Sequence, residues 1–262
     1  MVYAIDFTYN DIPLYSFGEY IVAGFDESGG DEAILSRSVN RSDITYDQPL
    51  AYDYGCVDEG IYSLELTIMK KSGEEFTQGE VRNLVGWLMS PTTPQWLNFT
   101  GCSTQIYDEL YYLGRFVSAS YSGGTSSQKV GITFTFESTS PYGFTREYKY
   151  TIKNNRRLII NNPGTKVGKT ILPRIEIIPT ATGIVTIDNA DDNIAPFSIN
   201  VTNGEMVIVE NHYCRKENGL LYPITNLNNY NWVTIKDGVN HIDVTGSATV
   251  IIKVRFYEAL GI

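Results

Sequence analysis

The segment that comes nearest to a phosphate-binding loop is Gly164–Thr170, which reads Gly-Thr-Lys-Val-Gly-Lys-Thr. A phosphate-cradling loop has four residues between its glycines, whereas this segment has three. Such a loop must also open a helix whose first amides face the phosphates, but Ile171-Leu172-Pro173 and a β-rich run follow here. The sequence therefore predicts a connection between strands that carries exposed lysines, and no cofactor.

Metal ligands are equally sparse. The two histidines, His212 and His241, lie in separate β-rich runs, and neither has a second ligand at metal-binding spacing. Asp188–Asn193 (Asp-Asn-Ala-Asp-Asp-Asn) is rich in oxygen donors, but it lacks the glycine and the distal glutamate of a calcium loop. We expect a turn at 188–193 and no metal site.

Motifs for nucleophilic catalysis are also missing. No serine lies in a Gly-x-Ser-x-Gly motif, and no cysteine is paired with a histidine by position. Residues 1–65 contain 13 acidic residues, too many for the sequence to single out a pair of carboxylates that would cleave a glycosidic bond. Cys56, Cys102 and Cys214 are far apart and odd in number, and we interpret them as reduced thiols of a protein made in a cytosol. We predict no catalytic and no cofactor-binding residue, and no enzymatic activity.

The secondary-structure elements that would have to position any functional residue are mostly strands. The 262 residues, 42% hydrophobic and 19% charged, suffice for one large domain or two ordinary ones. Tyr (19), Phe (11), Thr, Val and Ile are abundant, which favours β-structure. No apolar run approaches the roughly 18 residues of a membrane helix, and the first residues lack the basic and apolar regions of a signal peptide. We expect no membrane insertion.

Charge is divided unevenly along the chain. Residues 1–140 carry 19 acidic and 7 basic residues (net −12), whereas residues 141–262 carry 11 acidic and 13 basic residues (net +2). The total of −10 opposes general nucleic-acid binding. Arg146–Arg174 holds eight bases and one acid. The acidic region 1–65 and the basic segment 146–174 are each explained by a charged face exposed to solvent. The alternative hypothesis is that acidic residues of 1–65 pack against the basic segment, within a protomer or between copies.

The sequence predicts one helix at about 77–90. Thr77-Gln78-Gly79-Glu80 has the capping-box pattern, in which a threonine and a glutamate cap each other's backbone amides. The apolar residues that follow recur at helical spacing: Val81, Leu84, Val85 and Leu88. Ser90-Pro91 ends the run, because the residue before a proline avoids helical angles.

Strands are predicted on both sides of this helix. Ser63–Met69 alternates as a strand with one buried face, and Phe116–Tyr121 with Val130–Phe136 forms a hairpin with a long loop. The second half contains eight short runs: Leu158–Asn161, Arg174–Ile178, Ile184–Ile187, Pro196–Val201, Glu205–Glu210, Asn231–Ile235, Val239–Val244 and Thr249–Tyr257. Asn-Gly and Asp-Gly pairs at 203–204, 218–219 and 237–238 predict hairpin turns. We therefore expect a helix-containing domain at 1–140 and a β-sandwich at 141–262.

The order of several short motifs resembles the distal tail protein (Dit) family of long-tailed, non-contractile bacteriophages. These motifs are Gly86-Trp87-Leu88 at the end of the helix, Phe134–Glu137, Ser140–Phe144, Asn162-Pro163-Gly164, Pro173–Ile177, Gly238–Ile242 and Lys253–Tyr257. The resemblance covers the whole chain. It implies a mainly β fold, with an N-terminal β-sandwich or split-barrel-like domain carrying one helix and a C-terminal galectin-like β-sandwich.

The resemblance also implies a function. The N-terminal domain would form a hexameric ring that continues the tail tube, and the second domain would lie at its periphery. The partners would be the tail tube protein, the tail-associated hub protein, the tape measure protein and receptor-binding proteins, at the tail tip of a virion made in the bacterial cytoplasm. The sugar-binding residues of galectins are missing here, and fold alone would not establish sugar binding.

Two other functions remain as alternatives: a carbohydrate-binding adhesin or receptor-binding module, and a cell-wall hydrolase. The sequence fits an infectious phage and a tail-like bacteriocin equally well. It also leaves open which domain holds the last strand, Thr249–Tyr257.

Overall fold

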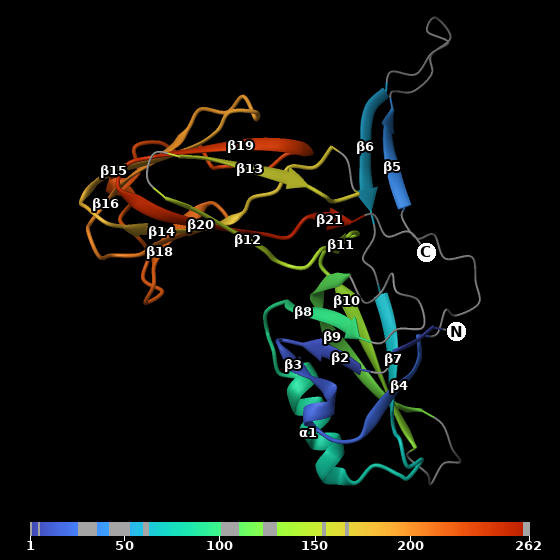
Figure 1. Cartoon of the computed structure of the whole chain (residues 1–262). Helices are drawn as coiled ribbons and strands as arrows, with labels where there is room; N and C mark the ends of the chain where they lie inside the picture. Colours follow the sequence, from blue (N-terminus) through green and yellow to red (C-terminus); the bar gives the residue numbers. More distant parts are fainter. Residues whose placement is uncertain are drawn as a thin grey trace, which may run out of the picture. The chain divides into compact units, whose positions relative to one another are not determined.

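The computed structural model describes residues 2–4, 6–25, 36–41, 53–59, 63–100, 110–122, 130–153, 156–165 and 168–258. The chain divides into two compact units (Figure 1), which are called unit 1 (residues 1–143) and unit 2 (residues 144–258). The short strand β11 (Gly143–Phe144) spans the boundary. Among the described residues, no helix combines the length and the hydropathy that a membrane span requires.

Unit 1 is built on one antiparallel sheet with the strand order β1-β4-β7-β10-β9-β8-β2-β3. Its strands are β1 (Val2–Ala4), β2 (Asp6–Tyr9), β3 (Ile12–Pro13), β4 (Tyr20–Phe25), β7 (Ser63–Lys70), β8 (Gln95–Thr100), β9 (Tyr111–Ser122) and β10 (Gly131–Ser138). A 3-10 helix, η1 (Leu14–Ser16), follows β3. Two further strands, β5 (Ser36–Arg41) and β6 (Asp53–Glu59), form a separate antiparallel ribbon.

This sheet curls around a single core. Tyr9 on β2 and Phe136 on β10 lie three strands apart in the sheet order, which would separate them by about 14 Å in a flat sheet. Their ring centroids are nevertheless 6.4 Å apart, in edge-to-face contact. The expected mainly β fold is thus confirmed, and the long sheet of unit 1 is continuous and curled.

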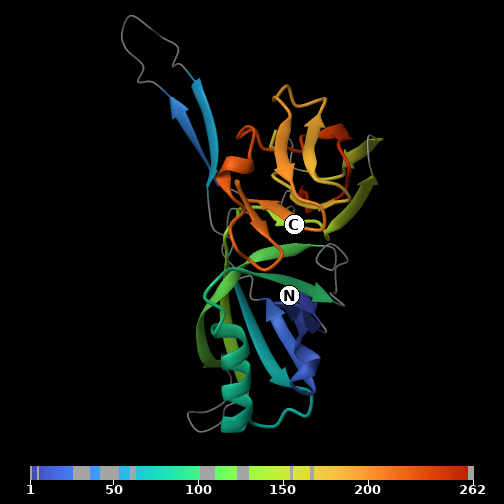
Figure 2. The same ribbon diagram turned by 90° about the vertical axis from the view of Figure 1, so that its left-hand side faces the viewer.

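Helix α1 (Gln78–Met89) packs beside the sheet of unit 1 (Figure 2). The capping box is present: the Thr77 hydroxyl accepts a hydrogen bond from the Glu80 amide (3.3 Å), and the Glu80 carboxylate accepts one from the Thr77 amide (2.7 Å). Leu84, Trp87 and Leu88 are buried. The helix prediction is confirmed, because its signals are local to the segment.

The two strand predictions of unit 1 are also confirmed. Leu64, Leu66 and Ile68 are the buried positions of β7. Strand β9 pairs with β10 in antiparallel register, with Ile132 opposite Tyr121. The connection at 123–129 lies outside the described residues.

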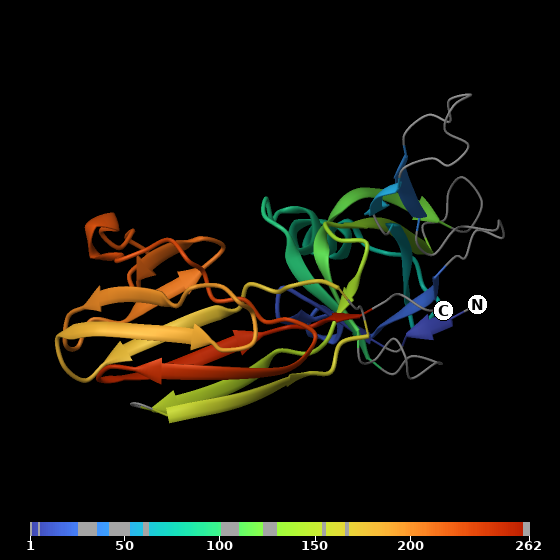
Figure 3. The same cartoon turned by 90° about the horizontal axis from the view of Figure 1, so that it is seen from above.

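Unit 2 is a sandwich of two antiparallel sheets, which lie one above the other in Figure 1 and are seen from above in Figure 3. The five-stranded sheet has the order β12 (Tyr148–Lys153), β20 (Ala248–Val254), β14 (Arg174–Pro179), β17 (Val207–Glu210), β18 (Tyr213–Lys216). The four-stranded sheet has the order β13 (Arg156–Asn162), β19 (Gly238–Thr245), β15 (Gly183–Asn189), β16 (Phe197–Val201). A 3-10 helix, η2 (Ile224–Asn226), and a short strand, β21 (Tyr257–Glu258), complete the unit. Because β20 lies between β12 and β14, the last long strand belongs to unit 2.

Three details of unit 2 differ from the sequence-based expectation. Asn231–Ile235 was expected to be a strand, but only Ile235 pairs, in an isolated bridge with Ile171. Asn203-Gly204 was expected to close a hairpin, but it connects β16 to β17, which belong to different sheets. Asp237-Gly238 likewise has a strand only on its C-terminal side, so two of the three expected hairpin turns are wrong.

Candidate functional site

The loop that comes nearest to a phosphate cradle is occupied by carboxylates of the chain itself. Glu258 accepts hydrogen bonds from the amide (3.2 Å) and the hydroxyl (2.6 Å) of Thr165, and the Asp237 carboxylate accepts one from the Gly168 amide. Ile171 then forms a β-bridge with Ile235, where a phosphate loop would open a helix. The described part of this loop therefore connects strands, as predicted, and offers these amides to no anion from solution.

The oxygen-rich segment 188–193 forms the predicted turn only in its second part, because Asp188 and Asn189 still belong to β15 and the turn begins at residue 190. The side chain of Asn189 accepts a hydrogen bond from the Asp191 amide (3.2 Å), and that of Asp192 accepts one from the Ile194 amide (2.8 Å). Asn193 has a positive φ of 58°. Such side-chain bonds two residues ahead stabilise turns. Within the described residues, no group of three or more His, Cys, Asp or Glu side chains is placed to hold a metal ion.

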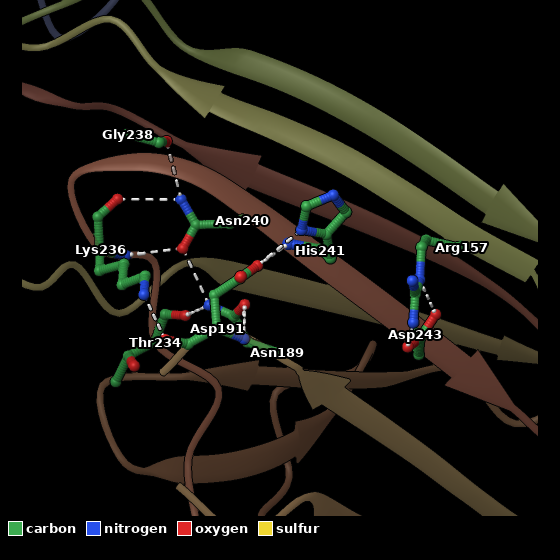
Figure 4. A network of polar contacts seen from close by, with 9 residues as sticks. All are labelled: Arg157, Asn189, Asp191, Thr234, Lys236, Gly238, Asn240, His241 and Asp243. Atoms are coloured by element: carbon green, nitrogen blue, oxygen red, sulfur yellow. Dashed lines mark hydrogen bonds and ion pairs between the residues drawn. The ribbon is translucent and has the colours of Figure 1, made fainter. Parts of the chain in front are cut away.

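The main polar feature of unit 2 starts from Asn240, which is fully buried on β19 (Figure 4). Its amide nitrogen donates to the carbonyl oxygens of Lys236 (2.9 Å) and Gly238 (3.1 Å). Its side-chain oxygen accepts from the Lys236 amide (2.9 Å) and from the Asn189 side chain (2.9 Å). Asn189 donates in addition to the Thr234 carbonyl oxygen (2.7 Å). Both buried amides thus fasten segment 234–238 to the four-stranded sheet.

A histidine–carboxylate pair and an ion pair, which involve His241 and Asp243 of β19, flank this network (Figure 4). His241 donates from its backbone amide (2.6 Å) to the Asp191 carboxylate and places Nδ1 2.8 Å from it. The amide and the ring of His241 lower the pKa of Asp191. Arg157 binds Asp243 through two parallel bonds of 2.8 and 2.6 Å, which lower the pKa of the Asp243 carboxyl. The Asp191 and Asp243 carboxylates are thus each paired with a basic side chain of the same unit. Among the described residues, no nucleophilic side chain is hydrogen-bonded to the His241–Asp191 pair.

A second chain of charges crosses the five-stranded sheet. Glu176, which is only 8% exposed, accepts from Lys253 (2.6 Å) and Arg174 (3.1 Å). Arg174 also approaches Glu210 (3.4 Å), which binds Arg215 (2.8 Å). Burial acts to raise the pKa of Glu176, but the two cations outweigh it and the pKa is lowered. These contacts link strands β20, β14, β17 and β18 and serve the packing of the sheet.

The remaining candidate residues also have structural roles. His212, with φ of 65°, and Asn211, with φ of 46°, close the β17–β18 hairpin. Trp232 stacks on Phe197 (centroids 5.7 Å apart), and the depression beside it has room for about one water molecule. Burial raises the pKa of the Cys214 thiol to about 11, as expected of an inert structural cysteine. Cys102 and the side chain of Cys56 lie outside the described residues.

The buried asparagine pair was not predicted from the sequence, although a signal for it exists. In β15 the inward positions are Val185, Ile187 and Asn189, and in β19 they are Asn240, Ile242 and Val244. An asparagine in phase with buried apolar residues predicts a fully hydrogen-bonded polar group in the core. The signal thus points to architecture and not to catalysis.

The fold is that of a β protein of two units, and the contacts described above pair the side chains of unit 2 with one another. Residues 2–140 match a family model described as the N-terminal domain of phage tail proteins, and residues 142–254 match one described as a phage tail C-terminal domain. The chain therefore belongs to this family of phage tail proteins.

Solved structures support this assignment at the level of the fold. The chain is similar to the Dit protein (gp 19.1) of phage SPP1, described as a paradigm of the hub adsorption apparatus in phages that infect Gram-positive bacteria. The identity is 14% and the TM-score 0.62, over 98% of this chain and 99% of that one. A chain of the phage P2 baseplate, in its activated conformation with calcium, matches at 10% identity and a TM-score of 0.57, over 95% and 97%. The resemblance to the distal tail family is thus confirmed in fold; among curated proteins, none matches the sequence.

Proposed function

We propose that this protein is the structural hub of a phage tail tip, forming a hexameric ring that joins the tail tube to the adsorption apparatus. The observation that carries the proposal is the match over nearly the full length of both chains to the SPP1 hub protein, including both units. Unit 1 forms the ring and unit 2 lies at its periphery. The galectin-like fold of unit 2 serves as a scaffold and not as a sugar receptor.

The partners follow from this position. The ring contacts the tail tube protein on one side and the tail-associated hub protein on the other, with the tape measure protein in the axis and receptor-binding proteins outside. It resides in the virion tail tip and is made in the cytoplasm of the host bacterium. It carries no enzymatic activity, which is consistent with the pairing of the Asp191, Asp243 and Glu176 carboxylates with side chains of the same unit.

The test is the mass of the purified full-length chain by sedimentation, combined with negative-stain images. We expect a six-membered annulus at micromolar concentration. A chain that stays monomeric at high concentration would contradict the proposal. Saturable binding to cell-wall polysaccharide by that monomer would favour the adhesin function, and hydrolysis of cell wall that is lost with one carboxylate would favour the hydrolase.

A further inference from the structure

The two sheets of unit 2 have four edge strands, of which two are covered by the chain. Along β16, the Asn228 amide donates to the Ser198 carbonyl oxygen (3.0 Å), and Asn229 accepts from the Ser198 amide (3.3 Å). Along β18, the Tyr222 amide donates to the Cys214 carbonyl oxygen (2.8 Å). Loops therefore satisfy backbone groups that would otherwise be open at these edges.

The other two edges, β12 and β13, are consecutive in the chain. Among the described residues, β12 pairs only with β20, and β13 pairs only with β19. Both strands thus present an unpaired backbone edge on the part of unit 2 that the structure describes. An open edge of this kind is a site for association with another chain unless its side chains prevent it.

Three of the four described cations of unit 2 without a partner lie on β12 and β13. Most basic side chains of unit 2 contact an acidic side chain, a carbonyl oxygen or an aromatic ring of the same unit: Arg146, Arg157, Arg174, Arg215, Lys216, Lys236, Lys253 and Arg255. Lys149, Lys153 and Arg156 are exposed and form no ion pair with a described residue. Apart from Lys169, they are the only described cations of unit 2 without such a contact. Lys149 on β12 lies directly opposite Lys253 on the neighbouring strand β20. Two like charges at opposite positions repel each other, which favours the binding of an anion from outside the sheet.

We propose that the β12–β13 edge, defined as the side of unit 2 formed by strands β12 and β13 with Lys149, Lys153 and Arg156, docks on exposed acidic residues of unit 1 of a second copy of this chain. The chain supplies the matching charge: residues 1–140 have a net charge of −12. Six exposed acidic residues of unit 1 form no ion pair with a described residue: Asp11, Glu19, Glu65, Glu74, Glu75 and Glu137.

A contact between two different surfaces of identical chains is heterologous, and such contacts close into rings when the rotation allows it. The inference rests on the proposed ring and adds which surface of unit 2 joins neighbouring copies. Complementary charges at such a contact fix the register and speed association.

The test compares the full-length protein with two variants of equal charge change. In the first, Lys149→Glu, Lys153→Glu and Arg156→Glu reverse the edge. In the control, Lys169→Glu, Thr170→Asp, Thr202→Asp, Asn203→Asp and Thr225→Asp make the same charge change at exposed positions of unit 2 outside β12 and β13. We expect the edge variant to weaken association between copies by roughly tenfold or more, because like charges would then face each other, while the control leaves the oligomer intact. A second edge variant with glutamine at the same positions, together with thermal melts, separates loss of docking from loss of folding.

Each outcome is decisive. A ring that persists in the edge variants, or that weakens equally in the control, would overturn the docking proposal and leave the proposed function standing. Larger aggregates in the edge variants would mean that the cations only protect an open edge. An unchanged ring that loses binding to soluble polyphosphate would assign the edge to a polyanion instead. A monomeric wild-type protein would contradict the ring itself.

Discussion

Asn189 and Asn240 meet side chain to side chain inside unit 2, where Nδ2 of Asn189 donates a 2.9 Å hydrogen bond to Oδ1 of Asn240. The two residues are 3% and 0% exposed and lie on neighbouring strands of one sheet. The Asn240 side chain also accepts a hydrogen bond from the Lys236 amide and donates to the carbonyl oxygens of Lys236 and Gly238. One buried side chain thus provides hydrogen bonds that a neighbouring strand would otherwise supply to this segment.

We predict that Asn240→Leu lowers the free energy of unfolding by about 3 kcal/mol, because several buried groups lose a hydrogen bond at once and each unsatisfied group costs roughly 1–3 kcal/mol. Urea denaturation of the full chain measures the loss. Asn161, an exposed asparagine on β13, is the matched control, and Asn161→Leu should change stability by less than about 0.5 kcal/mol. Equal losses in the two variants would show that the network contributes nothing specific.

Helix α1, the β17–β18 hairpin and the asparagine pair show which features could be predicted from the sequence and which could not. The helix at 78–89 was predicted with its cap, since the capping box and the apolar stripe are local. The β17–β18 hairpin was missed because Asn211 and His212 take positive φ without a glycine. The pair of asparagines joins residues 51 positions apart, and no local pattern states which buried polar groups will meet.

The ion pairs of Glu176 with Lys253 and Arg174 on the five-stranded sheet predict how the stability of the protein depends on acidic pH. The pKa of Glu176 is lowered from 4.5 because Lys253 and Arg174 outweigh the effect of burial. A carboxyl whose pKa is depressed on folding stabilises the protein above its unfolded pKa, and this contribution is lost as the pH falls through the folded pKa. The free energy of unfolding of the wild type should therefore decrease as the pH is lowered below about 4.5. The Glu176→Gln variant should lack the part of this decrease that comes from protonation of Glu176.

Chemical denaturation between pH 6 and pH 3 measures both curves, which should converge at the acidic end. Glu217→Gln, at an exposed position of the same unit, should follow the wild type throughout. Lys253→Met removes the other partner and should cost up to about 3 kcal/mol at neutral pH, the lower end for breaking a buried pair. Parallel curves for wild type and Glu176→Gln would refute the assigned role of this carboxylate.

The N-terminal cap of α1 gives a prediction for unit 1. Hydrogen bonds from Lys70 (2.8 Å) and from the Thr77 amide lower the pKa of Glu80 to about 2, so the carboxylate stays charged at the helix start. Thr77→Ala removes the hydroxyl that accepts from the Glu80 amide and should cost about 1 kcal/mol. Thr92→Ala, at an exposed site just after the helix, should cost far less. Hydrogen exchange of the first-turn amides locates the effect, and unchanged exchange in Thr77→Ala would rule the cap out as its origin.

The uneven charge of the chain predicts how assembly responds to salt. Exposed charges are screened as the Debye length falls from about 30 Å at 0.01 M salt to about 8 Å at 0.15 M. The association constant of the wild type should therefore fall over this range, and the glutamine variant of Lys149, Lys153 and Arg156 should show a shallower slope. Sedimentation across a salt series measures both, and equal slopes would place the electrostatic contact elsewhere on the chain.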